Sequence, residues 1–461
     1  MSGNQPQVFE SALFAEWVSG AAPSLPVTFC GVTQDSRNIT PGCLYVALRG
    51  ERFDGHDFVA QALRDGAAAA LVETSWLAPA EAVSWPLLRV ADTRLALADA
   101  ACAWRLKQRA RIVGITGSSG KTTTKEMAAA LFGGGGRVCA TCGNLNNEIG
   151  LPLSLLTLPA DAAFGIFELG TNHPGEIARL ADVLRPQAAI IASIGSAHIE
   201  HFGSQEAIAR EKGALLQALP ADGFAVLCKE TACFDALAEM SRAPVVTTTL
   251  AGDADFCGEV IEPCNGTLRV AERATGVRTV LCSGLPGIHN ASNLLLAFAA
   301  ARTAGISAEA AVEALHDFSL PGMRWQVSTH GGATVVNDAY NANPQSMAAA
   351  LETFMRMPCG GRRIAVLGDM LELGSHAEAL HREVGRRVAE LAPDGLIAVG
   401  ECAGRYLADE AVRNGLPSER VTLAGNAVDA AYVVHEIARG GDSVLLKASR
   451  GMGLERILDA W

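Results

Sequence analysis

The sequence has few aromatic residues, no long hydrophobic run and no excess of basic charge. Aromatic residues occupy 5% of its 461 positions, whereas 49% of the positions are hydrophobic and alanine and glycine are abundant. Small side chains let helices pack closely on a sheet, so this composition favours a layered α/β protein. The longest clean apolar run, residues 294–301, is too short to cross a bilayer, so we expect no membrane insertion.

The net charge and the absence of early basic residues bear on which partners the protein binds and in which compartment it works. The formal net charge is −12, which argues against a nucleic-acid partner because such a surface needs a basic face. The first basic residue is Arg37, so no basic n-region of a secretory signal peptide precedes it. We therefore expect a soluble, cytoplasmic protein, in which a few local Arg and Lys residues can still bind a small anion.

The 12 cysteines form no recognisable disulfide or metal framework. They are scattered through apolar segments and resemble small buried hydrophobic residues of a protein in a reducing compartment. Cys139 and Cys142 make a single C-x-x-C. Without a second pair at zinc-ribbon spacing, a metal or redox role is the less favoured interpretation.

The length and the rhythm of short apolar segments predict three α/β domains. Residues 1–107 predict a small mixed α/β domain. Residues 108–321 alternate β-rich and helical stretches, which is typical of a mainly parallel sheet, and residues 322–461 repeat the rhythm as a Rossmann-like domain. The expected strands lie at residues 43–48, 68–72, 87–90, 112–116, 164–168, 188–194, 224–228, 333–336, 364–367, 396–399, 421–423 and 444–447.

A glycine-rich phosphate loop is the most informative motif in the chain. Glycines let backbone amides face a polyphosphate, and the helix that follows presents its positive end. Lys121 can reach the β- and γ-phosphates, and the Thr122 hydroxyl can bind Mg²⁺. Ile115 replaces the first glycine of the usual pattern, and the alternative is a tight turn with a solvated lysine. The loop consists of Thr116, Gly117, Ser118, Ser119, Gly120, Lys121 and Thr122.

Three residues further along the chain are candidates for the same centre. Glu168 ends an apolar strand, where a carboxylate can hold the Mg²⁺ of a nucleotide or simply face solvent. His198 follows the 188–194 strand and fits a metal ligand and a satisfied loop histidine equally well. Lys212 lies in the helical stretch 205–219, where its spacing is typical of a surface lysine.

Polar segments at other strand ends mark further candidate surfaces. Asp35, Ser36 and Arg37 belong to a segment too polar for a core, which indicates a ligand-facing surface. Asn290 opens a helix and can either cap it, the commoner role, or bond an adenine edge. Ligands of such sheets gather at the carboxyl ends of strands. The candidate rim of the last domain comprises Arg324, Asp338, Tyr340, Asn341, Asn343, residues 368–374 and residues 447–450.

Taken in order over residues 35–450, these segments resemble the Mur ligases, the ATP-dependent amide-forming enzymes of peptidoglycan precursor synthesis. The variant phosphate loop of that family accounts for Ile115. The loop at residues 143–152 resembles the substrate loop of the family branch that adds D-alanyl-D-alanine, and residues 338–344 and 368–374 fit the same branch. The Asp-Asn-Pro-Arg motif of the diaminopimelate-adding relative is absent.

The resemblance implies ATP and Mg²⁺ as cofactors and a role for each matching residue. Lys121, Glu168, His198, Lys212 and Asp338 would be catalytic. Two positions depart from the usual pattern, because Met323 and His201 stand where relatives commonly have glycine. The implied metal ligands are Thr122, Glu168, His198 and a carbamylated Lys212; the implied nucleotide contacts are the phosphate loop, Thr123, Asn290, Arg324 and Asp338; and the implied substrate contacts are Asp35, Ser36, Arg37, Asn144, Asn146, Asn147, Tyr340, Asn341 and Asn343.

The implied reaction joins D-alanyl-D-alanine to UDP-N-acetylmuramoyl-tripeptide through an acyl phosphate, on a protein expected to be a monomer. ATP must supply a leaving group because a carboxylate is a poor electrophile. One alternative is a sister ligase that adds diaminopimelate or lysine, or a folylpolyglutamate synthase, against which the loop at 144–152 argues. The other is a non-catalytic nucleotide-dependent regulator, which would not need the second metal site implied by His198 and Lys212.

Overall fold

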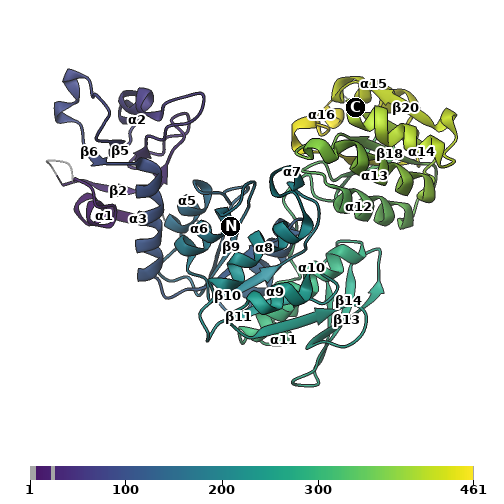
Figure 1. Cartoon of the computed structure of the whole chain (residues 1–461), viewed down its shortest axis with the longest axis horizontal. Helices are drawn as coiled ribbons and strands as arrows, with labels where there is room; N and C mark the ends of the chain where they lie inside the picture. The colour runs from purple at the N-terminus through teal and green to yellow at the C-terminus, as the bar shows by residue number, and fades with distance from the viewer. Residues whose placement is uncertain (1–6, 22–25, 460) are drawn as a thin grey trace.

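The computed structural model describes residues 7–21, 26–459 and 461, which form three sheets with their helices and one small antiparallel pair of strands. Figure 1 shows the N-terminal and C-terminal parts standing on opposite sides of the central part. The predicted α/β class with three units is confirmed. No helix in the described part of the chain is both long and apolar enough to cross a membrane.

The N-terminal unit is a four-stranded parallel sheet with a small antiparallel pair beside it. Its last helix, α3 (Thr93–Lys107), begins at Asp92, whose carboxylate accepts the amides of Arg94 and Leu95. Figure 1 shows α3 running down to the central unit. The other elements are β1 (Val8–Glu10), α1 (Ser11–Trp17), β2 (Thr28–Cys30), β3 (Val32–Thr33), β4 (Leu44–Val46), η1 (Gly55–Phe58), α2 (Val59–Arg64), β5 (Ala69–Glu73), η2 (Ala80–Ser84) and β6 (Leu87–Val90).

The central unit is a nine-stranded sheet in the order β15-β14-β13-β12-β11-β10-β7-β9-β8. It is parallel from β8 to β13, as predicted, and its last two pairings are antiparallel. Its strands are β7 (Arg111–Thr116), β8 (Val138–Ala140), β9 (Phe164–Glu168), β10 (Ala188–Ile191), β11 (Phe224–Cys228), β12 (Val245–Thr249), β13 (Phe256–Glu262), β14 (Thr267–Glu272) and β15 (Arg278–Cys282).

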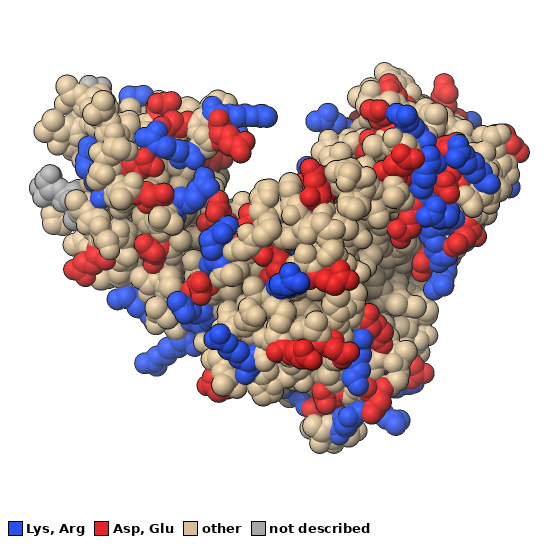
Figure 2. Space-filling model, in the orientation of Figure 1, with Lys and Arg blue, Asp and Glu red and all other residues tan. Residues whose placement is uncertain are grey.

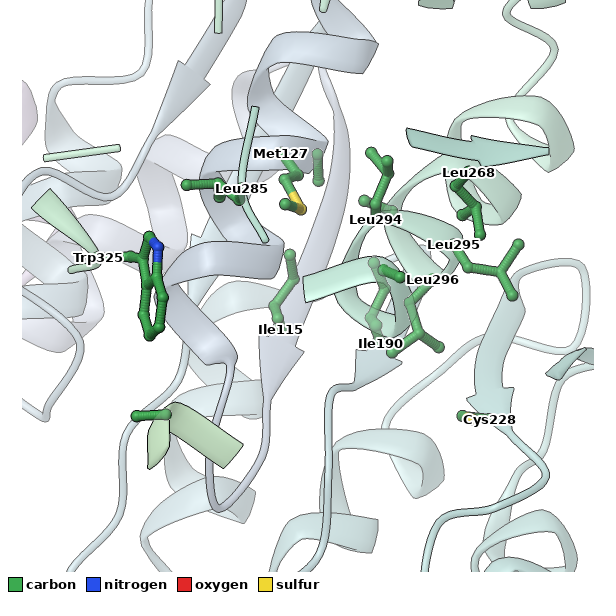
Figure 3. Close-up of a cluster of buried hydrophobic side chains, with 14 of the residues drawn as sticks. Ile115, Met127, Ile190, Cys228, Leu268, Leu285, Leu294, Leu295, Leu296 and Trp325 are labelled. Carbon is green, nitrogen blue, oxygen red and sulfur yellow. The ribbon is translucent and has the colours of Figure 1, made fainter. Parts of the chain in front are cut away.

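Helices cover both faces of this sheet, so its inner strands are apolar on both sides. In β10, Ala188 and Ile190 face one core, and Ala189 and Ile191 face the other. The apolar run 294–301 forms the buried middle of α10, and Figure 3 shows Leu294, Leu295 and Leu296 among the side chains of one core. The helices are α4 (Lys121–Gly133), α5 (Gly150–Leu156), α6 (Glu176–Leu184), α7 (Ile199–Phe202), α8 (Gln205–Gln217), α9 (Phe234–Met240), α10 (Ile288–Thr303) and α11 (Ala308–Ala314).

The C-terminal unit is a six-stranded sheet in the order β16-β17-β21-β18-β19-β20, parallel except for the β16–β17 pair. Its strands are β16 (Gln326–His330), β17 (Ala333–Asn337), β18 (Arg363–Gly368), β19 (Gly395–Val399), β20 (Val421–Ala424) and β21 (Ser443–Lys447). Its helices are α12 (Pro344–Arg356), η3 (Gly374–His376), α13 (Ala377–Leu391), η4 (Ala403–Ala408), α14 (Asp409–Arg413), η5 (Ser418–Arg420), α15 (Ala427–Ile437), η6 (Arg450–Met452) and α16 (Arg456–Asp459).

The expected burial of the cysteines is largely wrong. All 12 are free thiols, but only Cys43, Cys139 and Cys228 are buried, and Cys142, Cys264 and Cys282 are exposed. Cys142 and Cys264 lie in loops, and Cys282 lies on the exposed side of the edge strand β15. Cys139 and Cys142 thus form no buried pair, and the structure gives their C-x-x-C no shared site.

Candidate active site

The phosphate loop joins β7 to α4 at the carboxyl edge of the central sheet. The loop is anchored to the end of β10, because the Ser118 amide donates to Ser193 O at 2.8 Å and the Ser119 amide to Ser193 Oγ at 2.9 Å. Gly120 has φ +78°, a left-handed conformation that favours glycine. α4 begins at the next residue, so its positive N-terminus faces the loop.

One buried carboxylate connects the phosphate loop with the predicted substrate loop. Glu168, at the end of β9 and only 2% exposed, accepts the Thr122 hydroxyl at 2.7 Å on Oε2 and the Asn146 amide at 2.7 Å on Oε1. Lys121 Nζ donates to Gly117 O at 2.9 Å, and burial lowers the pKa of its ammonium. The solvent-exposed alternative for Glu168 is therefore wrong.

Two residues of the C-terminal unit reach across to the same loop. Arg324 Nη2 donates to Thr122 Oγ1 at 2.9 Å, and its guanidinium lies 3.6 Å from the Tyr340 ring centre. Asn343 Nδ2 donates to Ser119 Oγ at 2.8 Å, and its carbonyl caps α12. Asn343 was predicted among the substrate contacts, and in the structure it contacts the phosphate loop at Ser119.

The Lys212 side chain is buried in α8, so its interpretation as a surface lysine is wrong. It is 1% exposed, and within the described residues its amine has no hydrogen-bond or ion-pair partner. Burial, and next the nearby Lys121 ammonium, lower the pKa of Lys212 well below its usual value, whereas Glu211 opposes the shift. Helix periodicity placed Lys212 on a helix but could not show which face the central sheet covers.

His198 lies at the entrance of α7 with a left-handed backbone, at φ +60°. Its Nδ1 atom lies 2.7 Å from Glu372 Oε2 of the C-terminal unit. The nearby imidazoles of His198, His201 and His173 lower the pKa of the Glu372 carboxyl, with the His198 contact as the largest cause. The sequence predicted residues 368–374 as part of the rim of the last domain, but it did not identify Glu372 as the partner of His198.

The predicted nucleotide contacts Asn290 and Asp338 have separate partners within the protein. Asn290 is not the cap of α10, which is Gly287; its Nδ2 donates to Pro286 O at 2.8 Å. Asp338 pairs with the buried Lys447 ammonium at 2.6 Å and accepts the Trp325 amide at 3.2 Å. Lys447 also donates to Asn341 O at 3.3 Å.

The predicted substrate loop is partly structural. The side-chain oxygen of Asn147 accepts hydrogen bonds from the backbone amides of Ile149 and Gly150 at 3.2 and 2.8 Å, and so orders the start of α5. Asn144 O accepts the Asn146 amide at 2.8 Å. Glu148 forms an ion pair of 2.5 Å with Arg94 of α3, so this loop also touches the N-terminal unit.

Asp35, Ser36 and Arg37 lie together in the loop after β3. Asp35 and Arg37 form a bidentate pair with two distances of 2.9 Å, and these bonds lower the Asp35 pKa to about 2. Among the described contacts, none joins this segment to the phosphate loop. Figure 2 shows the two lobes separated by a wide hollow, with acidic and basic side chains interspersed on the face in view.

A second group of potential metal ligands, Asp369, His381 and Cys402, lies in the C-terminal unit. Both His381 nitrogens already have backbone partners, since Nε2 accepts the Met370 amide at 3.0 Å and Nδ1 lies 2.7 Å from Ala377 O. Asp369 Oδ1 accepts the Ala403 amide at 2.6 Å. We therefore assign this group a structural role.

The donors at the phosphate loop fit a hard divalent cation. The Thr122 hydroxyl and the Glu168 carboxylate are oxygen ligands, and each Glu168 oxygen has lone pairs beyond its single hydrogen bond. The loop, the helix start and the acidic residue on the neighbouring strand define a P-loop nucleotide-binding enzyme.

Comparisons with known proteins identify the family. Three family models match in order: "Mur ligase family, catalytic domain" at residues 28–105, "Mur ligase middle domain" at 115–301, and "Mur ligase, glutamate ligase domain" at 323–450. The chain belongs to the Mur ligase family.

Curated relatives extend the match along nearly the whole chain. The chain is 38% identical to the UDP-N-acetylmuramoyl-tripeptide–D-alanyl-D-alanine ligase of Escherichia coli over 83% of this chain and 84% of that one. It is 36% identical to the Bacillus subtilis ligase of the same name over 96% of both.

Solved structures agree with this assignment. A crystal structure of MurF from Acinetobacter baumannii is 27% identical, covers 99% of both chains and has a TM-score of 0.87. MurF from Thermotoga maritima in complex with ADP is 28% identical, covers 93% of this chain and 96% of that one, and has a TM-score of 0.78.

Proposed function

We propose that this protein is an ATP-dependent ligase that joins D-alanyl-D-alanine to UDP-N-acetylmuramoyl-tripeptide. The products are the UDP-linked pentapeptide, ADP and phosphate. The observation that carries the proposal is the shared carboxylate of Glu168, which bonds Thr122 of the phosphate loop and Asn146 of the substrate loop. The named substrates come from the ligases that match this chain along most of its length.

The reaction has two steps. The terminal carboxylate of the tripeptide attacks the γ-phosphorus of ATP, the bond to the bridging oxygen breaks, and ADP leaves. The amine of the dipeptide then attacks the acyl carbon, loses a proton, and phosphate departs from a tetrahedral intermediate. Two anions must meet in the first step, so Lys121, at the start of α4, is placed to stabilise the developing charge.

The residues present fit Mg²⁺, which when bound would supply Lewis-acid stabilisation to the phosphates. Thr122 and Glu168 would hold one ion, and His198 with modified Lys212 would hold a second. Asn290, Arg324, Asp338 and the loop residues from Thr116 to Thr123 would bind the nucleotide.

The buried amine of Lys212 supports its carbamylation. A lowered pKa leaves more of the amine neutral, and only a neutral amine attacks CO₂. The N–C bond forms, a carbon–oxygen electron pair moves to oxygen, and the nitrogen loses a proton. The cation thereby becomes an anion suited to a divalent metal.

We assign three functional regions on this basis. Residues 1–107 would bind the UDP part through Asp35, Ser36 and Arg37, residues 108–321 would bind ATP, and residues 322–461 would bind the dipeptide beside Tyr340 and Asn341. The 12 free cysteines suit a reducing compartment, and we place the reaction in the cytoplasm, on a monomer.

The test measures phosphate release from ATP with UDP-muramoyl-tripeptide, with and without D-alanyl-D-alanine. Single D-alanine and diaminopimelate serve as control amines, and Lys121→Ala serves as the inactive protein. We expect release that requires the dipeptide, with a pentapeptide product by mass. Release with diaminopimelate alone would identify a sister ligase, and ATP hydrolysis that ignores all the substrates would favour a regulator.

A further inference from the structure

Glu372 of the C-terminal unit reaches into the centre formed by the central unit. It follows β18 in the segment 368–374, and its Oε2 atom lies 2.7 Å from Nδ1 of His198. The His198 side chain is 17% exposed, so its ring is largely enclosed. Nδ1 is buried and lies at an ion-pair distance from Glu372, but the angles at this contact are not those of a hydrogen bond. The two residues come from different sheets.

Both residues have left-handed backbone conformations, which residues other than glycine rarely adopt. His198 has φ +60° and Glu372 has φ +61°, and neither is glycine. Such conformations persist where the surrounding structure over-determines them, and they cluster at functional sites. Strained backbone on each side of the contact therefore accompanies the close approach of the two side chains.

The segment that carries His198 is held by the C-terminal unit on more than one side. Gln345 Nε2 donates to Ile194 O at 3.2 Å, four residues before His198. Gly374 packs so closely on the helix after His198 that a Cβ at this glycine would lie 2.8 Å from Glu200 Cγ. Glu372 thus belongs to an interface that fixes this segment, and it contributes the contact to the ring itself.

The contact with Glu372 bears on which nitrogen of the His198 imidazole carries the proton. A carboxylate beside Nδ1 favours the tautomer that carries its proton there, which leaves the Nε2 lone pair available to a metal. We propose that Glu372 is a positioning residue of the ligase reaction, which orients His198 as a metal ligand only when the central and C-terminal units are docked. This inference rests on the proposed function, since that function assigns His198 to the second Mg²⁺.

The variants for the test are Glu372→Ala and Glu372→Gln, with Glu378→Gln as matched control. Glu378 is a 56% exposed glutamate of the same unit, paired with Arg382 on α13. Glutamine keeps an oxygen that can accept from Nδ1, so Glu372→Gln should recover much of what alanine loses. The thermal midpoint of all three variants should stay close to wild type, because Glu372 is itself 55% exposed.

The first readout is Mn²⁺ binding to the protein with a non-hydrolysable ATP analogue, followed by electron paramagnetic resonance. Loss of a group that orients a metal ligand weakens binding by about 10–100-fold. We expect Glu372→Ala to weaken the second Mn²⁺ by about tenfold and leave the first unchanged. In turnover, kcat should fall and the Mg²⁺ requirement should rise, while KM for the UDP-linked substrate stays within about twofold.

The outcomes separate this inference from the proposed function. Wild-type Mn²⁺ binding in Glu372→Ala would overturn the inference, whether or not activity falls, because Glu372 would then be only an interface residue. A weakened second site in Glu372→Ala with restoration in Glu372→Gln would support it, even if the wild type used another amine. Use of another amine by the wild type would overturn only the substrate assignment.

Discussion

Lys212 is the residue whose surroundings most change its chemistry. Its amine is buried in α8 beside the Lys121 ammonium, and the lowered pKa favours the neutral, nucleophilic form. Removal of this side chain should leave the fold intact, because a buried amine without a hydrogen-bond partner contributes little to stability. Its loss should instead remove the anion that carbamylation would supply to the metal centre.

We predict that Lys212→Ala lowers kcat by at least about 100-fold and that acetate or formate partly restores it. A short carboxylate can occupy the space of the carbamate and supply its oxygen ligands. Lys229→Ala, which removes an exposed lysine of the same unit, is the control and should not respond to added carboxylate. Phosphate release across a titration of acetate measures the effect. Full activity of Lys212→Ala without acetate would contradict the carbamate assignment.

His289 makes part of the stability of the protein depend on pH. Burial lowers its pKa from 6.5 to about 4. Between pH 6.5 and 4 the unfolded chain takes up a proton that the folded protein does not, so the free energy of unfolding falls as the pH falls. The loss begins as the pH falls through about 6.5 and is complete below about pH 4, where both states carry the proton.

We predict that His289→Gln reduces the fall in thermal midpoint between pH 7 and pH 4.5. Differential scanning calorimetry at several pH values measures it. His435→Gln, at an exposed position of α15, should follow the wild-type curve. If His289→Gln and wild type lose the same stability on acidification, the burial of His289 is not the cause.

At the level of elements, the sequence predicted the strands that are apolar on both faces. Residues 224–228 match β11 at both ends, since an unbroken apolar segment between helical stretches identifies a buried parallel strand. The predicted strand 188–194 is too long, because after Ile191 the chain leaves the sheet to carry Ser193 to the phosphate loop. The antiparallel strands β13–β15 went unpredicted because their exposed faces carry polar residues in no helical or strongly apolar pattern.

The site was predictable in its motifs but not in its long-range contacts. Lys121, Thr122 and Glu168 were identified because a phosphate loop and a strand-end acid are local patterns. The pairing of His198 with Glu372 joins two sheets, and the sequence holds no local signal for it. The burial of Lys212 likewise depends on the packing of α8, which single-residue spacing does not reveal.

The turn before α4 depends on a glycine for two independent reasons. Gly120 has φ +78°, and a Cβ there would lie 2.6 Å from Asn293 Oδ1 of α10. We predict that Gly120→Ala weakens binding of ATP by at least about tenfold and lowers stability by about 1–3 kcal/mol, because the loop must shift to relieve the clash. Isothermal titration with an ATP analogue and thermal melting measure the two effects.

The control for this prediction lies at the other end of the same helix. Gly133 ends α4, has no atom near its Cβ position and has no left-handed conformation. Gly133→Ala should keep wild-type nucleotide affinity and change stability by at most about 1 kcal/mol. Equal nucleotide affinity in both variants would show that the loop tolerates a side chain at residue 120.

At the scale of the whole molecule, the three units are joined by unequal connections. The C-terminal unit contacts the phosphate loop through Arg324 and Asn343, and it contacts His198 through Glu372, so these two units are already docked. The N-terminal unit is attached through α3, with Arg94 paired to Glu148 in the substrate loop. Figure 2 shows the remaining hollow between the N-terminal and C-terminal lobes.

This arrangement predicts which ligand compacts the protein. The UDP-linked substrate would bind in the N-terminal unit and extend its peptide toward Glu168, so it would draw that unit over the central one, as closure of a multi-domain enzyme requires. We expect the radius of gyration in small-angle scattering to fall with this substrate, and to change little with an ATP analogue alone. Arg94→Ala should keep the compaction but need more substrate, since Arg94 fixes the substrate loop. Compaction by the ATP analogue alone would instead mean that the central and C-terminal units are apart in the free protein, which would contradict the docked contacts of Arg324 and Glu372.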